Sequence, residues 1–243
     1  MNNCAFITGA SGGIGKAIAL RLAADGFDIA ACWHTDEAGA KQLGEELEKL
    51  GTKFRLYQTD VSDFSQMKNV FADALDYFGN VCVLVNNAGM AQQKLFTDIS
   101  EEEFDRICDV NFKSVYNCCK FAVPHMVNRK SGKIINISSM WGVCGASCET
   151  VYSATKAAVI GFTKALGKEL APSNVQVNCI APGAIDTKMN SILSDEDKAA
   201  FAEEIPAGRF GNPEEIAGVV SFLAGKDSSY ITAQVITADG GLT

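Results

Sequence analysis

The feature that most constrains the fold is a regular alternation of short apolar runs with longer amphipathic segments along the 243 residues. The runs are rich in β-branched residues and nearly continuous in hydrophobicity, and they cover Ala5–Thr8, Ile29–Trp33, Phe54–Gln58, Val81–Asn86, Lys133–Ser138, Val175–Ile180 and Val235–Thr237. Strands that are buried on both faces of a parallel sheet have this pattern, whereas strands with one solvent-facing side alternate. The sequence therefore predicts seven buried parallel strands.

Helical stretches separate these runs, among them Lys16–Asp25, Asp36–Leu50, Ser65–Phe78, Glu101–Asn128 and Ser153–Leu170. Ser100 followed by Glu103 forms a capping-box pattern at the start of the fourth stretch. No low-complexity linker interrupts the alternation. We therefore expect one α/β domain over residues 1–243, a doubly wound Rossmann-type fold with a seven-stranded parallel sheet and helices on both faces.

Charge and composition exclude several classes of protein. Lys plus Arg number 21 against 29 Asp plus Glu, which gives a net charge of −8, the wrong sign for a nucleic-acid partner. No apolar stretch approaches the ~20 residues of a membrane span. The N-terminus also lacks the basic and apolar regions of a secretory signal. We expect a cytoplasmic protein with neither a nucleic-acid nor a membrane partner.

The nine cysteines are an odd number and form no C-x-x-C pair, and the only histidines are His34 and His125. This pattern lacks the spacing of metal ligands, so no metal site is expected. Buried thiols that pack as small hydrophobes in a reducing compartment are the simplest interpretation. Cys144 and Cys148 are kept apart because they lie in a loop discussed below.

A glycine-rich turn, Thr8–Gly15, directly follows the first predicted strand and opens into a helix. Glycines let backbone N–H groups approach a pyrophosphate closely, and the helix N-terminus adds positive potential. A tight strand–helix turn without a ligand is the alternative. The strand–turn–helix context favours dinucleotide binding, although the spacing is G-x-x-x-G-x-G rather than G-x-G-x-x-G.

Further motifs follow this turn in a fixed order: Asp60-Val61, Asn86-Asn87-Ala88-Gly89, Asn111, Ser139, Tyr152 and Lys156 in Y-S-A-T-K, and Pro182-Gly183 with Thr187 beyond. Together with the glycine turn they resemble the short-chain dehydrogenase/reductase family. The resemblance runs from residue 4 to Asp239-Gly240-Gly241. It implies cofactor binding by Gly9, Ser11, Gly12, Gly13, Ile14, Gly15, His34, Asp60, Val61, Asn87, Ala88, Gly89, Tyr152, Lys156, Pro182, Gly183, Ile185 and Thr187.

The catalytic residues that the resemblance implies are Asn111, Ser139, Tyr152 and Lys156. Tyr152 lies four residues before Lys156, so a helix places both side chains on one face. The Lys156 ammonium and the positive charge of an oxidised nicotinamide would lower the phenol pKa, which lets Tyr152 exchange a proton with a carbonyl oxygen that Ser139 holds. Asn111 would hold a water that links Lys156 to solvent. Alone, Y-x-x-x-K is usually a solvated helix face, and Ser138 competes with Ser139 for the serine role.

The cofactor is expected to be NADP(H), with NAD(H) as the alternative. Fold members that use NAD place a carboxylate at the end of the second strand, where this chain has Trp33. His34 could face a 2′-phosphate, although Gly12 stands where NADP-preferring relatives often carry a basic residue. Asp36 comes three residues too late and is interpreted as a helix cap.

The substrate loop is assigned to residues 140–151 and a lid to about 184–212, with Met140, Trp141, Cys148 and Glu149 as substrate contacts. The whole chain resembles the 3-oxoacyl-acyl-carrier-protein reductase group of fatty acid biosynthesis. The loop instead resembles reductases of 5-aminopentanone on translation elongation factor P. Glu149 would suit the ammonium of such a substrate, and Trp141 would add a cation–π contact. A Trp packed on the loop and a surface Glu are the alternative.

The expected partner is a small-molecule or carrier-bound ketone, with acyl carrier protein or elongation factor P as the carrier. Arg129, Lys130 and Lys133 form a basic cluster expected near the site mouth, or else a solvated helix end. Relatives commonly form tetramers through two long helices, so a homotetramer is expected. A nucleotide-binding scaffold without catalysis is a remote alternative, because all four catalytic residues are present.

Overall fold

A computed structural model describes residues 3–187 and 194–243. Seven strands form one sheet in the order β3-β2-β1-β4-β5-β6-β7, and every pairing is parallel. Their bounds are β1 Cys4–Ile7, β2 Asp28–Trp33, β3 Phe54–Gln58, β4 Val81–Asn86, β5 Gly132–Ile137, β6 Val175–Pro182 and β7 Val235–Ala238. The predicted α/β class and seven parallel strands are confirmed.

The strand order reverses direction at β1, which lies between β2 and β4. The chain winds outward from β1 to β2 and β3 on one side, and from β4 to β7 on the other. Connections that leave in opposite directions open a crevice above the carboxyl ends of the strands, where open α/β sheets bind ligands. The loops after β1 and β4 therefore border this crevice.

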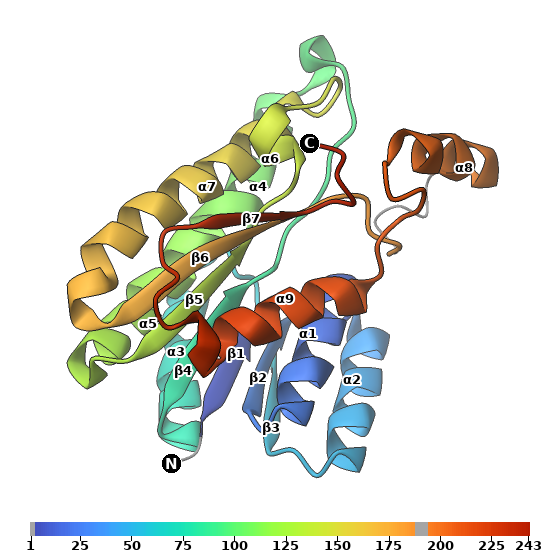
Figure 1. The fold of residues 1–243 in the computed structure, drawn as a ribbon. Helices are drawn as coiled ribbons and strands as arrows, with labels where there is room; N and C mark the ends of the chain where they lie inside the picture. Colours follow the sequence, from blue (N-terminus) through green and yellow to red (C-terminus); the bar gives the residue numbers. More distant parts are fainter. Residues whose placement is uncertain (1–2, 188–193) are drawn as a thin grey trace.

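Helices cover both faces of the sheet (Figure 1). One face carries α1 (Gly13–Ala24), α2 (Glu37–Lys49) and α9 (Pro213–Ala224), and the other carries α3 (Phe64–Phe78), α5 (Ser114–Arg129) and α7 (Thr150–Leu170). Side chains alternate across β1, so that buried Phe6 packs on Phe71 of α3 while buried Ile7 joins Ile18 of α1. The two apolar layers hold the sheet between the two helix sets.

The expected helix over Glu101–Asn128 is interrupted. The structure has α4 (Glu101–Cys108), a π-helical turn over Asp109–Lys113, and then α5. The Ser114 hydroxyl donates to the Val110 carbonyl over 2.6 Å inside this turn. Side-chain periodicity does not register a single wider turn, and such turns are frequent at functional sites.

The segments expected to form the substrate loop and the lid contain short helices, α6 (Trp141–Cys144) and α8 (Asp195–Glu204). Part of the lid, residues 188–193, lies outside the described residues. Its two ends are joined, because Gly211 N donates to the Ala184 carbonyl and Asp186 N donates to the Gly211 carbonyl, each over 2.9 Å. The helix α8 stands apart from the sheet (Figure 1).

The basic cluster lies elsewhere than expected. Arg129 ends α5, and Lys133 stands at the amino end of β5, where its ammonium donates to the Ser228 hydroxyl over 3.0 Å. This is the edge of the sheet opposite the carboxyl ends, so the cluster does not border the crevice. The expectation failed because Lys133 and Ser139 are close in sequence but separated by the length of a strand.

Within residues 3–187 and 194–243, no helix combines the length and apolar character that a bilayer span needs.

Candidate active site

The glycine turn after β1 is shaped for close approach of backbone. Gly9 has a φ of +65° and Gly13 a φ of +52°, in the left-handed region that favours glycine. A Cβ on Gly15 would overlap the carbonyl oxygen of Gly9 and come within 2.6 Å of Asn87 Nδ2. The turn thus leaves its backbone amides exposed to the crevice at the start of α1, the arrangement that binds phosphates.

The segment after β4 is pinned to this turn. Thr8 Oγ1 accepts hydrogen bonds from the backbone N–H groups of Asn87 and Ala88, both over 3.0 Å. Asn87 Nδ2 donates to the carbonyls of Thr8 over 3.0 Å and Gly9 over 3.1 Å. These four hydrogen bonds therefore join the loop after β1 and the loop after β4 into one unit.

A cavity of about 360 Å³ runs from this unit across the ends of β5 and β6. Its lining contains the predicted cofactor residues Gly9, Ser11, Gly12, Gly13, Ile14, Gly15, Asn87, Ala88, Gly89, Tyr152, Lys156, Pro182, Gly183, Ile185 and Thr187. It also contains Asp36, Ile137, Ser138 and Ser139. The segment after β6 reaches the turn, since a Cβ on Gly13 would lie 3.3 Å from Thr187 Cγ2.

A second cavity, of about 260 Å³, adjoins the first through Gly9, Ser11, Asp36, Ala88 and Gly89. The remaining predicted cofactor residues, His34, Asp60 and Val61, line it. It also contains residues that sequence reasoning did not assign to the cofactor: Cys32, Trp33, Thr35, Asp36, Thr59, Met90, Arg106 and Val110. Two adjoining cavities that share the glycine turn fit a dinucleotide, with the adenosine end in the smaller one.

Asp36 has a double position. As predicted, it caps a helix, because its Oδ1 accepts from Gly39 N at the start of α2 over 3.0 Å. It also lines both cavities. The sequence could have indicated this position, since Asp36 caps the helix that follows β2 at the carboxyl end of that strand, where ligands bind in this fold.

Ser139, Tyr152 and Lys156 face the larger cavity together. Ser139 accepts from Trp141 N over 3.1 Å and hydrogen bonds the Tyr152 phenol. The neighbouring Ser138 instead donates its hydroxyl to the carbonyl of Lys156 over 2.8 Å. The two serines therefore have different roles: Ser139 contacts the phenol of Tyr152, whereas Ser138 links the end of β5 to α7.

Burial dominates the electrostatics of the pair on α7. It lowers the pKa of Lys156 from 10.5 to about 8, and the ammonium donates to the Ile137 carbonyl over 3.0 Å. Burial also raises the pKa of Tyr152, the hydrogen bond with Ser139 opposes this rise, and Glu149 adds to it. Lys156 Nζ lies 5.8 Å from the centre of the phenol ring and engages the Ile137 carbonyl, and the lowering of the phenol pKa by Lys156 together with a bound oxidised nicotinamide stays a prediction.

Asn111 is buried in the π-helical turn. Its Oδ1 accepts from Met90 N over 2.8 Å, while Nδ2 donates to the Met90 carbonyl over 3.0 Å and to Thr155 Oγ1 over 3.1 Å. A Cβ on Gly89 would lie 3.2 Å from Lys156 Nζ and 3.4 Å from Asn111 Oδ1. The Asn111 side chain thus joins the loop after β4 to α7 beside Lys156.

The four predicted substrate residues do not gather at the larger cavity as the predicted cofactor residues do. Among the described residues that line the larger cavity, Met140, Trp141, Cys148 and Glu149 are all absent. Met140 is buried and Trp141 packs on a small apolar group that includes Val151 and Tyr152. Cys148 takes a left-handed φ of 63°, and its carbonyl accepts from Lys94 N over 2.7 Å. The half-buried Glu149 lies close enough to influence Tyr152.

All nine cysteines are free thiols, and those at positions 4, 32, 118, 119 and 179 are buried. In the described part of the chain, no three His, Cys, Asp or Glu side chains gather as a metal site requires.

Comparisons with known proteins agree with this geometry. A family described as Enoyl-(Acyl carrier protein) reductase matches residues 9–243. A 3-oxoacyl-[acyl-carrier-protein] reductase FabG of Staphylococcus aureus is 40% identical over 100% of this chain and 98% of its own length. Proteins of the same name are 42% identical in Thermotoga maritima, over 98% and 96% of the two chains, and in Chlamydia muridarum, over 100% and 98%. The chain therefore belongs to the short-chain dehydrogenase/reductase family and is an NAD(P)-dependent oxidoreductase that acts on a carbonyl or alcohol.

Proposed function

We propose that the chain is an NADP(H)-dependent 3-oxoacyl thioester reductase of fatty acid biosynthesis, acting on a substrate bound to acyl carrier protein. The observation that carries the proposal is the meeting of Ser139, Tyr152 and Lys156 with the glycine turn in one cavity. The names of relatives that are 40–42% identical along the chain support the substrate class.

In this mechanism, the carbonyl oxygen of the substrate lies between the hydroxyls of Ser139 and Tyr152. A nicotinamide held by the glycine turn and Lys156 would supply the hydride for this reduction. Ser139 stabilises the negative charge that develops on the oxygen, and Tyr152 donates its phenolic proton to it. Lys156 orients the bound ribose and supports the positive potential around the phenol. Asn111 keeps the loop after β4 in register with α7.

The electrostatics support the direction of reduction. Because burial raises the pKa of Tyr152, the phenol remains protonated at neutral pH. A protonated phenol is the form that can donate to a carbonyl, whereas oxidation of an alcohol would need the phenolate. We therefore propose that ketone reduction is the principal reaction.

Cofactor choice rests on the smaller cavity. Trp33 occupies the end of β2, His34 lines the cavity, and the Arg106 guanidinium adds positive charge, all of which favour NADP(H). Asp36 lines the same space and works against a 2′-phosphate, which keeps NAD(H) usable. Steady-state kinetics with NADPH and NADH test this proposal, and a higher kcat/KM for NADH would overturn it.

A second candidate substrate is the 5-aminopentanone group on translation elongation factor P. Glu149 favours it, because its half-buried carboxylate has no hydrogen bond or ion pair to any described residue, and burial raises its pKa. An unpaired carboxylate in such a place attracts a cation. An ammonium on the substrate would supply that partner.

The deciding experiment is NADPH oxidation with acetoacetyl-CoA and with aminopentanone-modified elongation factor P, side by side. The main proposal predicts the higher kcat/KM for acetoacetyl-CoA. The second candidate predicts the reverse, together with a loss in Glu149→Gln that is confined to the ammonium-bearing ketone. Equal effects of Glu149→Gln on both substrates would contradict the proposal that Glu149 binds a substrate ammonium.

The assembly and location remain part of the proposal. We propose a homotetramer that forms through α5 and α7, where Tyr116 of α5 is 45% exposed. The free thiols suit a reducing compartment, so we propose that the enzyme is cytoplasmic. Sedimentation at micromolar concentration would test the assembly, and a monomer would contradict it.

A further inference from the structure

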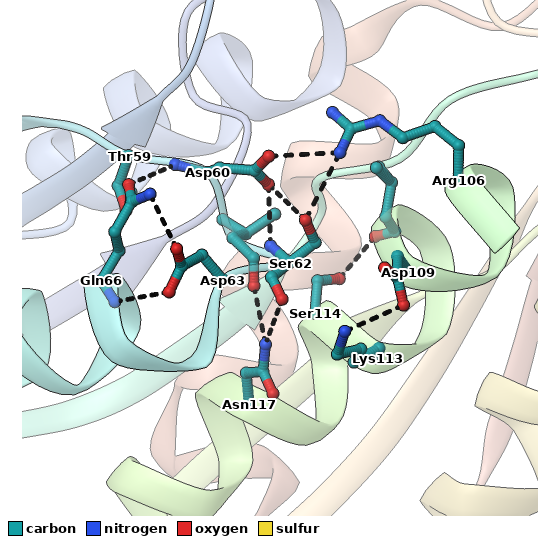
Figure 2. Close-up of polar contacts among 12 residues, drawn as sticks. Thr59, Asp60, Ser62, Asp63, Gln66, Arg106, Asp109, Lys113, Ser114 and Asn117 are labelled. Carbon is teal, nitrogen blue, oxygen red and sulfur yellow. Dashed lines mark hydrogen bonds and ion pairs between the residues drawn. The ribbon is translucent and has the colours of Figure 1, made fainter. Parts of the chain in front are cut away.

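Two helices hold the loop after β3 from different sides (Figure 2). From α4, Arg106 Nη1 donates to Asp60 Oδ2 over 3.2 Å and to the Ser62 hydroxyl over 3.4 Å. Asp60 Oδ1 accepts from Ser62 N over 2.9 Å and from the Ser62 hydroxyl over 2.6 Å. Both oxygens of Asp60 are thus engaged, and despite burial these contacts lower the pKa of Asp60.

The second contact comes from α5. Asn117 is buried, and its Nδ2 donates to the carbonyls of Val61 and Ser62, each over 3.1 Å. These are backbone acceptors, so Asn117 fixes the path of the loop whatever the loop's side chains do. Arg106, in contrast, holds the loop through the Asp60 carboxylate, which borders the smaller cavity, and through the Ser62 hydroxyl.

The π-helical turn that carries Asn111 lies between these two anchors in the chain. Arg106 precedes Asn111 by five residues and Asn117 follows it by six. α4 runs directly into the turn, which also contributes Val110 to the lining of the smaller cavity. A change in how α4 sits on the loop therefore acts on the turn without any intervening flexible segment.

Arg106 is placed to respond to what the smaller cavity holds. It is the only Arg or Lys among the described residues that line this cavity, and its side chain is 46% exposed. Only Nη1 of its guanidinium has a partner among the described residues, so the N–H groups of Nη2 and Nε are available to donate to a ligand. An adenosine moiety with its phosphates offers acceptors and a ring face for such a group.

We propose that Arg106 is a positioning residue that couples occupancy of the adenosine cavity to the placement of Asn111 through α4 and the π-helical turn. The proposal rests on the cofactor site of the proposed function. A bound adenosine group contacts the loop and Arg106 together, which tightens α4 onto the loop and restrains the turn. Asn111 then holds Met90 and Thr155 in register for catalysis.

The test uses the full chain and the adenosine half of the cofactor alone, 2′,5′-ADP. Trp141→Phe leaves Trp33 as the only tryptophan, because the chain has two, and Trp33 lines the adenosine cavity. Its fluorescence reports binding independently of turnover. Hydrogen exchange of the amides over 109–113 is then compared with and without saturating 2′,5′-ADP. Lys113→Ala is the matched control, since it removes a half-exposed cation of the same turn that pairs with Asp109.

In the wild type and in Lys113→Ala, saturating 2′,5′-ADP is expected to slow exchange over 109–113. In Arg106→Ala, the Kd should rise about tenfold, as for the loss of one partly exposed charge-assisted contact. Protection of the turn should be lost even at saturation, and kcat at saturating NADPH should fall. Arg106→Lys, which keeps the charge, should recover part of the protection and carries the same test if Arg106→Ala fails to fold.

Two results would overturn the coupling: unprotected amides over 109–113 in the wild type at saturation, or full protection in Arg106→Ala with only KM for the cofactor raised. Failure of the proposed function would look different. If 2′,5′-ADP protects the turn in an Arg106-dependent way but the chain reduces no ketone, the coupling is supported and the proposed reductase function is contradicted.

Discussion

The glycine turn after β1 and the catalytic group on α7 border the same cavity but are built in opposite ways. The turn is made of backbone: its amides and φ angles do the work, and a Cβ on Gly15 would overlap the Gly9 carbonyl. The catalytic group is made of buried side chains, in which Tyr152 and Lys156 have pKa values shifted by burial. A backbone site should tolerate no added atoms, whereas a side-chain site should tolerate substitutions that fill the same space but lose the chemistry.

The largest effect expected from this contrast is that of Tyr152→Phe. The ring continues to fill its place, but no proton reaches the carbonyl oxygen, so kcat should fall about 10³-fold or more. Cofactor affinity by fluorescence and the melting temperature should stay near the wild-type values. An active Tyr152→Phe variant would show that another group donates the proton.

Gly15→Ala should have the next largest effect, and of the opposite kind. The added methyl group meets backbone and Asn87 Nδ2, so one of the two loops must move. We expect a loss of about 3 kcal/mol in the free energy of unfolding and a cofactor Kd raised at least tenfold. Thermal melting and fluorescence titration measure both.

Gly218→Ala is the matched control for that substitution. It adds the same methyl group inside α9, where the nearest atom would be Arg21 Nη1 at 3.9 Å. It should stabilise the chain by about 0.5 to 1 kcal/mol, because alanine loses less backbone freedom on folding. Equal losses in both variants would mean that the glycine turn has no special intolerance.

The adjacent serines separate a chemical role from a structural one. Ser139→Ala should lower kcat about 10²-fold, as for loss of one donor to the developing oxyanion, and the lost hydrogen bond from Trp141 N should cost no more than about 1 kcal/mol of stability. Ser138→Ala removes the hydrogen bond that the Ser138 hydroxyl donates to the Lys156 carbonyl, which should cost about 1 kcal/mol of stability while kcat stays within about tenfold. Reversed outcomes would exchange the roles of the two residues.

The same contrast explains what could be predicted from the sequence. The strands and their parallel pairing followed from hydrophobic patterns, and the residues that line the cavities followed from motifs that resemble one family, among them a turn with Gly9 at a positive φ that favours glycine. The π-helical turn, the pairing of Arg106 with Asp60 and the low pKa of Lys156 depend on three-dimensional contacts across distant segments. The substrate contacts in the loop around Trp141 and Glu149 were the hardest to predict from the sequence, because packing decides which side chains of that loop face a ligand.

The smallest effect expected is the pH dependence of stability that the buried Lys156 contributes. Its pKa is about 8 in the folded chain against an ordinary value of 10.5. Below about pH 8 the lysine is charged in both states, so the cost of burying the charge is fully present. Between pH 8 and 10.5 the unfolded state binds more protons, so the free energy of unfolding should rise with pH.

Buried thiols such as those of Cys32 and Cys119 oppose this rise, because burial raises their pKa and their unfolded forms ionise first near pH 9. Comparison with Lys156→Met removes the contributions of Cys32 and Cys119, because Lys156 is not among the causes of their pKa shifts, whereas Cys179 is coupled to Lys156 and changes with it. The stability advantage of Lys156→Met over the wild type should therefore shrink from pH 8 to pH 10 by on the order of 1 kcal/mol. Urea denaturation at several pH values measures it. A constant difference would mean that Lys156 is solvated, and the side-chain half of the contrast would then lose its electrostatic basis.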